Sequence, residues 1–328
     1  MSNTSSFIGS IRSLLACAVA VLVVAPAAAQ PLPEARAIPL PAGFEYPNGV
    51  ARAGDGSLYV GSVVDGRILV RPPEGGWRTF FPGSAEIYAG TSLRLDEARG
   101  LLWGASPDFL VQGRPARPHR VFALDVQTGQ VRRSLVVPDG GFGNDLALEP
   151  DGSVLVTDSS NGRLLRVPAG ASRFEVVVAD ARLRGPDGIG VGGIARAVDG
   201  RLVLGNFGAG KLYALEGTTL REIALPRPIE NPDGLAFAED GSLLITEGAV
   251  VSGDGKVLRV DDPFGAGERP LGQLAAGLES PVNLTVSPDG RAFVTEARIR
   301  HRMVPDQNIT TPTSFRLVIL PAELSTAQ

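Results

Sequence analysis

Amide and carboxylate side chains stand at corresponding places in a phrase that this sequence repeats. Asn48, Asn144 and Asp233 each come two residues before the first apolar residue of their copy, in PNGV, GNDLAL and PDGLAF. Further oxygen-bearing side chains lie near the starts of these or other copies: Asp145, Asp187 and Asn283. Oxygen ligands that converge from different repeats suit a hard cation, above all Ca²⁺.

The alternative is that Asn, Asp and Gly simply form the turns that precede strands. That alternative suffices for any one residue, but turn formers need not share one offset in several repeats. We therefore expect a divalent-cation site, with Ca²⁺ preferred and Zn²⁺, Mg²⁺ or Mn²⁺ as alternatives. A histidine-rich zinc site is excluded because the chain has only 2 histidines. The expected cation ligands are Asn48, Asn144, Asp187 and Asp233, and the expected substrate contacts are Asp145 and Asn283.

The repeated phrase consists of an apolar run, a turn with glycine and a second apolar run. Its turn glycines are Gly56, Gly100, Gly152, Gly200, Gly241 and Gly290. Successive glycines lie between 41 residues (Gly200 to Gly241) and 52 residues (Gly100 to Gly152) apart. A period of this size is typical of a solenoid or a propeller.

The local pattern favours strands. Asp-Gly between short alternating apolar runs predicts a tight hairpin, because glycine adopts the positive φ that such turns require. In most copies a second turn and two further apolar runs follow, as in NGRLLRV and FEVVVA. The repeats therefore predict an all-β fold, a six-bladed β-propeller of four-stranded antiparallel blades. A pair of β-sandwiches is the alternative, but it does not account for the near-equal spacing.

A propeller must close its ring and place its polar residues. The apolar run SFRLVILP (314–321) lies beyond the last hairpin and ARAIPLP (35–41) precedes the first. We expect one blade to combine strands from both ends, which removes an open sheet edge. Each inner strand should start at the channel mouth, and each second strand should return to that face. The second strands end with Asp158, Asn206, Glu247 and Glu296, which we interpret as solvent-exposed rim residues.

The first 29 residues are expected to be an export signal, followed by a single propeller domain over 30–328. Arg12 precedes a short apolar run, Leu14–Val24, and Ala27–Ala29 offers a small-residue cleavage site. A membrane anchor and a lipidated Cys17 are the alternatives, but the run is short for a bilayer and lies mostly after the cysteine. We expect a periplasmic or secreted monomer with no membrane span after removal of the signal.

Composition limits the partners. The chain carries 31 Lys+Arg against 35 Asp+Glu, a net charge of −4, which argues against nucleic acid. Its only cysteine lies in the expected signal, so the mature chain has no disulfide. A small-molecule substrate or ligand remains the expected partner.

The phrases PNGV, GNDLALEPDG and NPDGLAFAEDG resemble the senescence marker protein/gluconolactonase family, and more distantly the paraoxonase and strictosidine-synthase-like propellers. The resemblance covers six repeats, from residue ~44 to residue ~320. It implies a divalent cation in the channel, held by a Glu from blade one, Asn residues from blades three and four and an Asp from blade five. Asn144 and Asp233 match this pattern, whereas Asn48 stands where the family has Glu and Gly192 where it has Asn. These departures imply weaker metal binding.

Three functions are compatible with the sequence. The first is a metal-dependent hydrolase of lactones or related esters, with Asp233 as general base. The second is a non-catalytic propeller that binds a ligand or protein partner at the same face, which Gly192 favours. The third is a quinone-dependent sugar dehydrogenase, for which two histidines and two lysines, Lys211 and Lys256, provide few of the expected groups.

Overall fold

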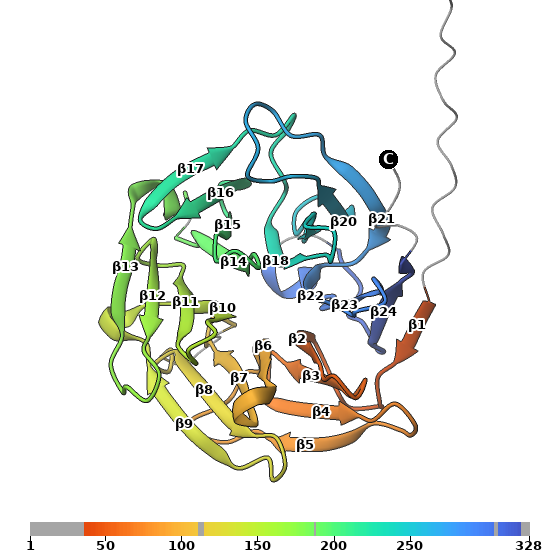
Figure 1. The fold of residues 1–328 in the computed structure, drawn as a ribbon. Helices are drawn as coiled ribbons and strands as arrows, with labels where there is room; N and C mark the ends of the chain where they lie inside the picture. Colours follow the sequence, from red (N-terminus) through yellow and green to blue (C-terminus); the bar gives the residue numbers. More distant parts are fainter. Residues whose placement is uncertain (1–35, 111–114, 187, 305–307, 323–328) are drawn as a thin grey trace, which may run out of the picture. The chain divides into compact units, whose positions relative to one another are not determined.

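The computed structural model describes residues 36–110, 115–186, 188–304 and 308–322. Within these ranges the chain forms six four-stranded antiparallel sheets arranged as the blades of a ring, which confirms the predicted six-bladed β-propeller (Figure 1). The expected signal, residues 1–29, and Asp187 lie outside the described residues. No helix in the described part of the chain is long and apolar enough to cross a bilayer.

Each blade runs outward from the channel in chain order. Blade 1 holds β2 (Pro47–Arg52), β3 (Leu58–Ser62), β4 (Arg67–Arg71) and β5 (Arg78–Pro82), and blade 2 holds β6 (Thr91–Asp96), β7 (Leu101–Ser106), β8 (Arg120–Asp125) and β9 (Val131–Val136). Blade 3 holds β10 (Gly143–Leu148), β11 (Val154–Asp158), β12 (Arg163–Val167) and β13 (Glu175–Ala179). Blade 4 holds β14 (Val191–Arg196), β15 (Leu202–Asn206), β16 (Lys211–Glu216) and β17 (Thr219–Ile223), and blade 5 holds β18 (Pro232–Phe237), β19 (Leu243–Glu247), β20 (Gly255–Val260) and β21 (Gly272–Leu278).

The last blade joins the two ends of the chain. It holds β22 (Pro281–Val286), β23 (Ala292–Glu296) and β24 (Arg316–Leu320), with β1 (Arg36–Pro39) as its outermost strand. β1 runs antiparallel to β24, with Arg36 opposite Ile319 and Pro39 opposite Arg316 (Figure 1). The prediction that one blade combines strands from both ends is therefore confirmed.

Helical structure is confined to connections. The described helices are the 3₁₀ turns η1 (Glu97–Arg99), η2 (Pro138–Gly140) and η3 (Ala181–Leu183) and the short α1 (Arg300–Met303) between β23 and β24. In the inner hairpins, the turn glycines adopt positive φ as the sequence predicted, for example 92° at Gly56 and 90° at Gly152.

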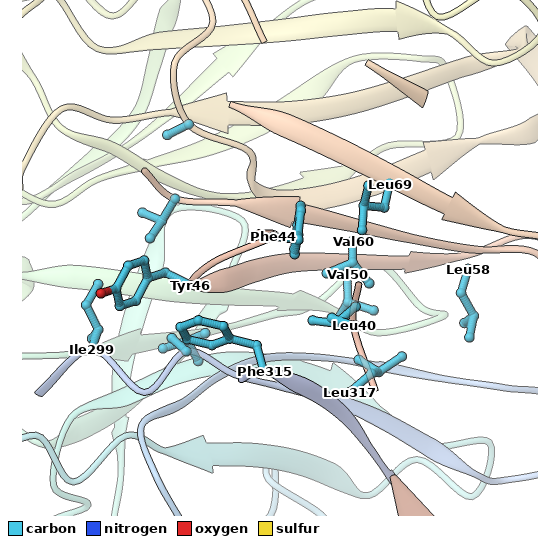
Figure 2. Close-up of a cluster of buried hydrophobic side chains, with 14 of the residues drawn as sticks. Leu40, Phe44, Tyr46, Val50, Leu58, Val60, Leu69, Ile299, Phe315 and Leu317 are labelled. Atoms are coloured by element: carbon cyan, nitrogen blue, oxygen red, sulfur yellow. The ribbon is translucent and has the colours of Figure 1, made fainter. Parts of the chain in front are cut away.

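The hydrophobic core is divided into clusters that each join two neighbouring blades. The cluster that closes the ring packs Val50, Val60 and Leu69 of blade 1 against Leu317 of blade 6 (Figure 2). Apolar burial between neighbours is thus what holds successive blades together, and it leaves the inner ends of the blades free to line a channel.

Every inner strand is interrupted by a β-bulge near its start. The pairing register with the second strand shifts, for example, between Pro47 and Val50 in β2 and between Pro232 and Leu235 in β18. The other four inner strands shift at equivalent places. A bulge inserts an extra residue and re-aims side chains, so the start of each inner strand can turn a side chain into the channel.

Candidate active site at the channel mouth

A small cavity lies at one end of the central channel, where the inner strands begin. Its volume is about 50 Å³, room for roughly four water molecules. The residue that each repeat carries at the shared offset lines this cavity in five of the six blades: Asn48, Thr91, Asn144, Asp233 and Val282. Three of the sequence-predicted cation ligands are therefore brought together here from blades 1, 3 and 5.

Gly192 holds the offset in blade 4 and brings no side chain. A Cβ atom at this position would lie 3.4 Å from Asn144 Nδ2. The space that a blade-4 ligand would occupy is thus next to the amide of the blade-3 ligand.

Asp233 is the one acidic side chain among the described residues that line the cavity. Its carboxylate has no hydrogen-bond partner within the described part of the chain, although it is only partly exposed. Burial in the channel raises its pKa well above the ordinary value, and the negative charge of Asp145 raises it further. A carboxylate in such surroundings binds a proton or a cation more readily than one on the surface.

The two amide atoms of Asn144 can be told apart by elimination. Ser159 Oγ donates its proton to the carbonyl oxygen of Val191 at 2.6 Å. It can therefore only accept from Asn144 Nδ2, which lies 3.0 Å away. This contact assigns the NH₂ group of Asn144 to Ser159 and leaves the amide oxygen for another partner.

Asn48 is held through its backbone instead. Its carbonyl oxygen accepts a hydrogen bond from Thr295 Oγ1 of blade 6 at 2.5 Å, while no partner for its side-chain amide is found within the described ranges. The amide is thus free to serve a ligand.

Ser280 is a cavity residue that the sequence did not reveal. Its side chain is fully buried and its Oγ has no hydrogen-bond partner within the described residues, yet the residue lines the same cavity. Its backbone is in the left-handed region, with φ of 50°, as are Tyr46 and Asn231, the residues two before Asn48 and Asp233. Strain of about 1–3 kcal/mol at such residues is common at functional sites, and a positive φ at serine or tyrosine leaves no signal in a single sequence.

Asp145 is placed between blades and does not line the cavity. Its Oδ1 accepts from Leu146 N at 2.7 Å and pairs with Arg94 at 2.8 Å, and its Oδ2 accepts from Ile194 N at 3.1 Å. Burial raises the pKa of this carboxyl, and the positive charge of Arg94 opposes the rise. These contacts give Asp145 the role of joining blades 2, 3 and 4.

Asn283 occupies the equivalent place in blade 6 and is also buried. Its Oδ1 accepts from Leu284 N at 2.9 Å. The third residue of the inner strand is crowded elsewhere in the ring, since a Cβ atom at Gly193 would lie 1.9 Å from the carbonyl oxygen of Asp233. This position points toward the neighbouring blade, so substrate contacts by Asp145 and Asn283 remain predictions that their placement does not favour.

The polar residues that end the second strands are buried, and the interpretation of them as solvent-exposed rim residues is wrong. Asp158 and Asn206 have no exposed surface, and Glu247 and Glu296 are 2% exposed. Each binds the segment that leads into an inner strand: Glu247, for example, accepts from Glu230 N at 2.8 Å, and Glu296 from Glu279 N at 2.8 Å. They anchor the loops of the mouth.

The rest of the described cavity wall is mainly apolar. Aromatic and aliphatic side chains surround the polar groups, among them Phe109, Phe142, Phe207, Val250, Ile299 and Met303. Phe109 stacks on Phe142 at 5.6 Å between ring centroids, and His119 contacts the edge of Phe142 at 4.8 Å. A ligand here would meet a few oxygen atoms within a hydrophobic surround.

The donor set fits a hard cation in kind and is poor in charge. Asp233 offers a carboxylate, and Asn48 and Asn144 offer amide oxygens, whereas the buried Ser280 Oγ has no surface open to a ligand. Among the described residues there is no group of three or more His, Cys, Asp or Glu side chains that could hold a metal ion. Oxygen donors that carry a single negative charge are typical of a weak divalent-cation site. Water or substrate would supply the remaining ligands of the cation.

The fold is shared with proteins of several activities. The chain resembles a protein of Thermus thermophilus assigned as an oxidoreductase (glucose dehydrogenase), with a TM-score of 0.61 and 17% identity over 88% of this chain and 100% of that one. It resembles a gluconolactonase of Xanthomonas campestris, with a TM-score of 0.61 and 16% identity over 88% and 91%. It also resembles virginiamycin B lyase of Staphylococcus aureus, with a TM-score of 0.57 and 14% identity over 80% and 82%.

No protein-family model matches the chain, and a search of curated proteins finds no significant match. At low sequence identity, the similar structures include a gluconolactonase, as the sequence predicted, and also an oxidoreductase and a lyase. They show the fold, and the reaction must be argued from the site.

Proposed function

We propose that this protein is a metal-dependent hydrolase of lactones or related esters, with its active site in the cavity at the channel mouth. The observation that carries the proposal is the Asp233 carboxylate, which lacks an intramolecular partner among the described residues and lines a small cavity with two amide oxygens. The likeness to a gluconolactonase adds support at the level of the fold. The apolar run and Ala27–Ala29 at the start of the sequence further support an exported protein.

The polar residues of the cavity have different roles in the proposed ester hydrolysis. Asp233, whose pKa is raised by burial, accepts the proton of the attacking water. Asn48 and Asn144 would hold a divalent cation with their amide oxygens. When bound, a divalent cation supplies polarisation of the carbonyl and a lower pKa for water.

The apolar wall favours a hydrophobic substrate over a sugar lactone. Hydroxyl groups of a sugar would lose their water against Phe109, Phe142, Phe207 and Met303 and find few described partners, which is costly. A cavity of about 50 Å³ admits only the carbonyl end of such a substrate. An alkyl or aryl substituent would gain about 0.8 kcal/mol for each CH₂ that it buries against the apolar side chains around the opening.

The test is hydrolysis of two lactones by the purified protein with added Ca²⁺. We expect a γ- or δ-lactone with an alkyl tail to be hydrolysed with a kcat/KM at least tenfold higher than glucono-δ-lactone, and EDTA to abolish both reactions. Preference for the sugar lactone would contradict the hydrophobic substrate. Hydrolysis that is indifferent to EDTA would contradict the metal.

A binding protein without catalysis is the second candidate, and Gly192 favours it because one ligand position lacks a side chain. It predicts that alkyl lactones bind without turnover. A dehydrogenase is less consistent with the site, because neither His119 nor His301 is among the residues that line the cavity.

Asp233 is the single carboxylate among the described residues of the site, and this leads to a prediction about the affinity for Ca²⁺. Asn48→Glu adds a second carboxylate from blade 1, and oxygen sites bind Ca²⁺ more tightly as ligand charge increases. We expect calorimetric titration to show tighter Ca²⁺ binding by this variant than by the parent protein. Thr91→Glu, in the neighbouring blade, shows whether any added charge has the same effect. Unchanged or weaker binding in Asn48→Glu would mean that Asn48 does not face the ion.

A further inference from the structure

The opposite end of the channel holds a second and wider cavity, of about 320 Å³. It is lined by the ends of the inner strands where they leave the channel, far along each strand from the residues of the mouth. Most of its lining residues are apolar, but they include Arg52 of β2, Arg94 of β6 and Arg196 of β14. No aspartate or glutamate is among its described lining residues. We call this cavity the arginine funnel.

Two of the three arginines have no carboxylate partner within the described residues. Arg52 Nη1 donates to the carbonyl oxygen of Ala53 at 3.2 Å, and Arg196 Nη1 donates to that of Ala197 at 3.5 Å. Each of these bonds uses one of the five N–H groups of a guanidinium. Most of the donor capacity of both side chains is therefore available.

Arg94 differs because it is tied to a buried acid. It stands where four other inner strands have alanine, at Ala51, Ala147, Ala195 and Ala236. Its Nη2 pairs with Asp145 Oδ1 at 2.8 Å. The pair fixes the guanidinium at the wall of the funnel and leaves it about one fifth exposed, at 19%.

Most acids on the surrounding hairpins already have other partners, for example Asp55, which accepts from Ser57 N at 2.7 Å, and Glu97, which accepts from Gly54 N. Asp199 pairs with Arg201 at 2.7 Å, Asp240 with Arg259 at 2.8 Å and Asp289 with Arg291 at 2.7 Å. Positive charge gathered in a concave site with low-dielectric walls attracts anions.

We propose that the arginine funnel binds a small molecule that carries two or more oxyanion groups, either phosphates or carboxylates. Guanidinium groups bind both kinds of oxyanion through paired N–H donors. Arginines on blades 1, 2 and 4 approach from different sides, which suits a ligand with more than one anionic group. The volume lies at the lower end of the range for small-molecule sites, about 300–1,000 Å³. This binding is independent of hydrolysis at the mouth.

The test is calorimetric titration of the purified protein with pyrophosphate, citrate and acetate at low ionic strength. We expect pyrophosphate or citrate to bind at least tenfold more tightly than acetate, and the tighter of the two identifies the preferred oxyanion. The double variant Arg52→Gln/Arg196→Gln should weaken this binding at least tenfold. Arg52→Lys/Arg196→Lys keeps the charge without the paired donors and should fall between the two.

Asp199→Asn/Arg201→Gln is the matched control, because it removes both members of an ion pair on a neighbouring part of the same face, outside the funnel, and leaves neither charge unpaired. It should bind like the parent protein, and circular dichroism should show that all variants are folded. Binding that is equal in the parent and in the Arg52/Arg196 double variants, or equal for all three anions, would overturn the proposal. A loss on changing Asp233 alone would place the anion at the mouth and would also overturn it.

Discussion

Asp233→Asn should lower kcat/KM for a lactone by about 10²- to 10⁴-fold, the usual contribution of a general base. The variant keeps the shape of the side chain and one oxygen donor, but it removes the proton acceptor and the only carboxylate of the described cavity wall. Bound Ca²⁺ should also be lost. Steady-state kinetics and metal analysis of the purified variant give both results.

The same substitution should not harm the fold. Because burial raises the pKa of Asp233, the folded metal-free protein holds a proton on this group more tightly than the unfolded chain does. The charged carboxylate therefore lowers stability at neutral pH, and this cost disappears below the pKa of the unfolded chain, about 3.9. We expect Asp233→Asn to raise the Tm of the metal-free protein at pH 7 and to leave it unchanged near pH 3.

Asp199→Asn is the matched control, since it removes a half-exposed carboxylate of the opposite face. It should leave both activity and metal content unchanged. An Asp233→Asn protein that keeps its activity would remove Asp233 from the mechanism, and one that unfolds would make Asp233 a structural residue.

Asp158→Ala should cost about 3–5 kcal/mol of unfolding free energy, the usual effect of removing one member of a buried ion pair. Asp158 has no exposed surface. Its carboxylate accepts from Phe142 N at 2.9 Å, from Asn161 Nδ2 at 3.0 Å and from Arg163 Nε at 2.8 Å. Few of these donors could find water in its place, so urea denaturation should show the loss directly.

Asp139→Ala provides the comparison, because Asp139 pairs with the same Arg163 at 2.9 Å but is 72% exposed. It should cost about 0–1 kcal/mol. Equal effects of the two substitutions would mean that burial does not decide the strength of these pairs. Since Asp158 also holds the backbone of Phe142, a wall residue of the cavity, its loss should raise KM for apolar lactones as well.

The fold could be predicted because its signals are local and repeated. A hairpin turn such as that at Gly152 needs a residue that accepts positive φ. Because this turn recurs once in each repeat, the number of turns gives the number of blades. The placement of Asn48, Asn144 and Asp233 at one cavity could be predicted for the same reason, because residues at the same offset in each repeat face the same channel.

The features that could not be predicted from the sequence depend on a single residue of register or on distant partners. Asp145 stands one residue from Asn144, and in the bulged strand that step turns its side chain from the channel to Arg94 of the neighbouring blade. In the sequence Asp158 is indistinguishable from a surface acid, because its partners Phe142 and Arg163 meet it only in the folded protein. The strained backbone of Ser280 is likewise set by the blades around it.

Because β1 pairs with β24, the order in which the chain is synthesised limits when the sixth blade can be completed. Arg36 finds its partner Ile319 only when nearly the whole chain exists. At about 5–20 residues per second, the first strand waits tens of seconds with its backbone groups unmatched. Blades 1 to 5 can each form as soon as they emerge, whereas the sixth cannot be completed until its outer strand meets the three strands made last. Loss of β1 should therefore leave the sixth blade one strand short, with β24 as a newly exposed edge that is prone to pair with other copies of the chain.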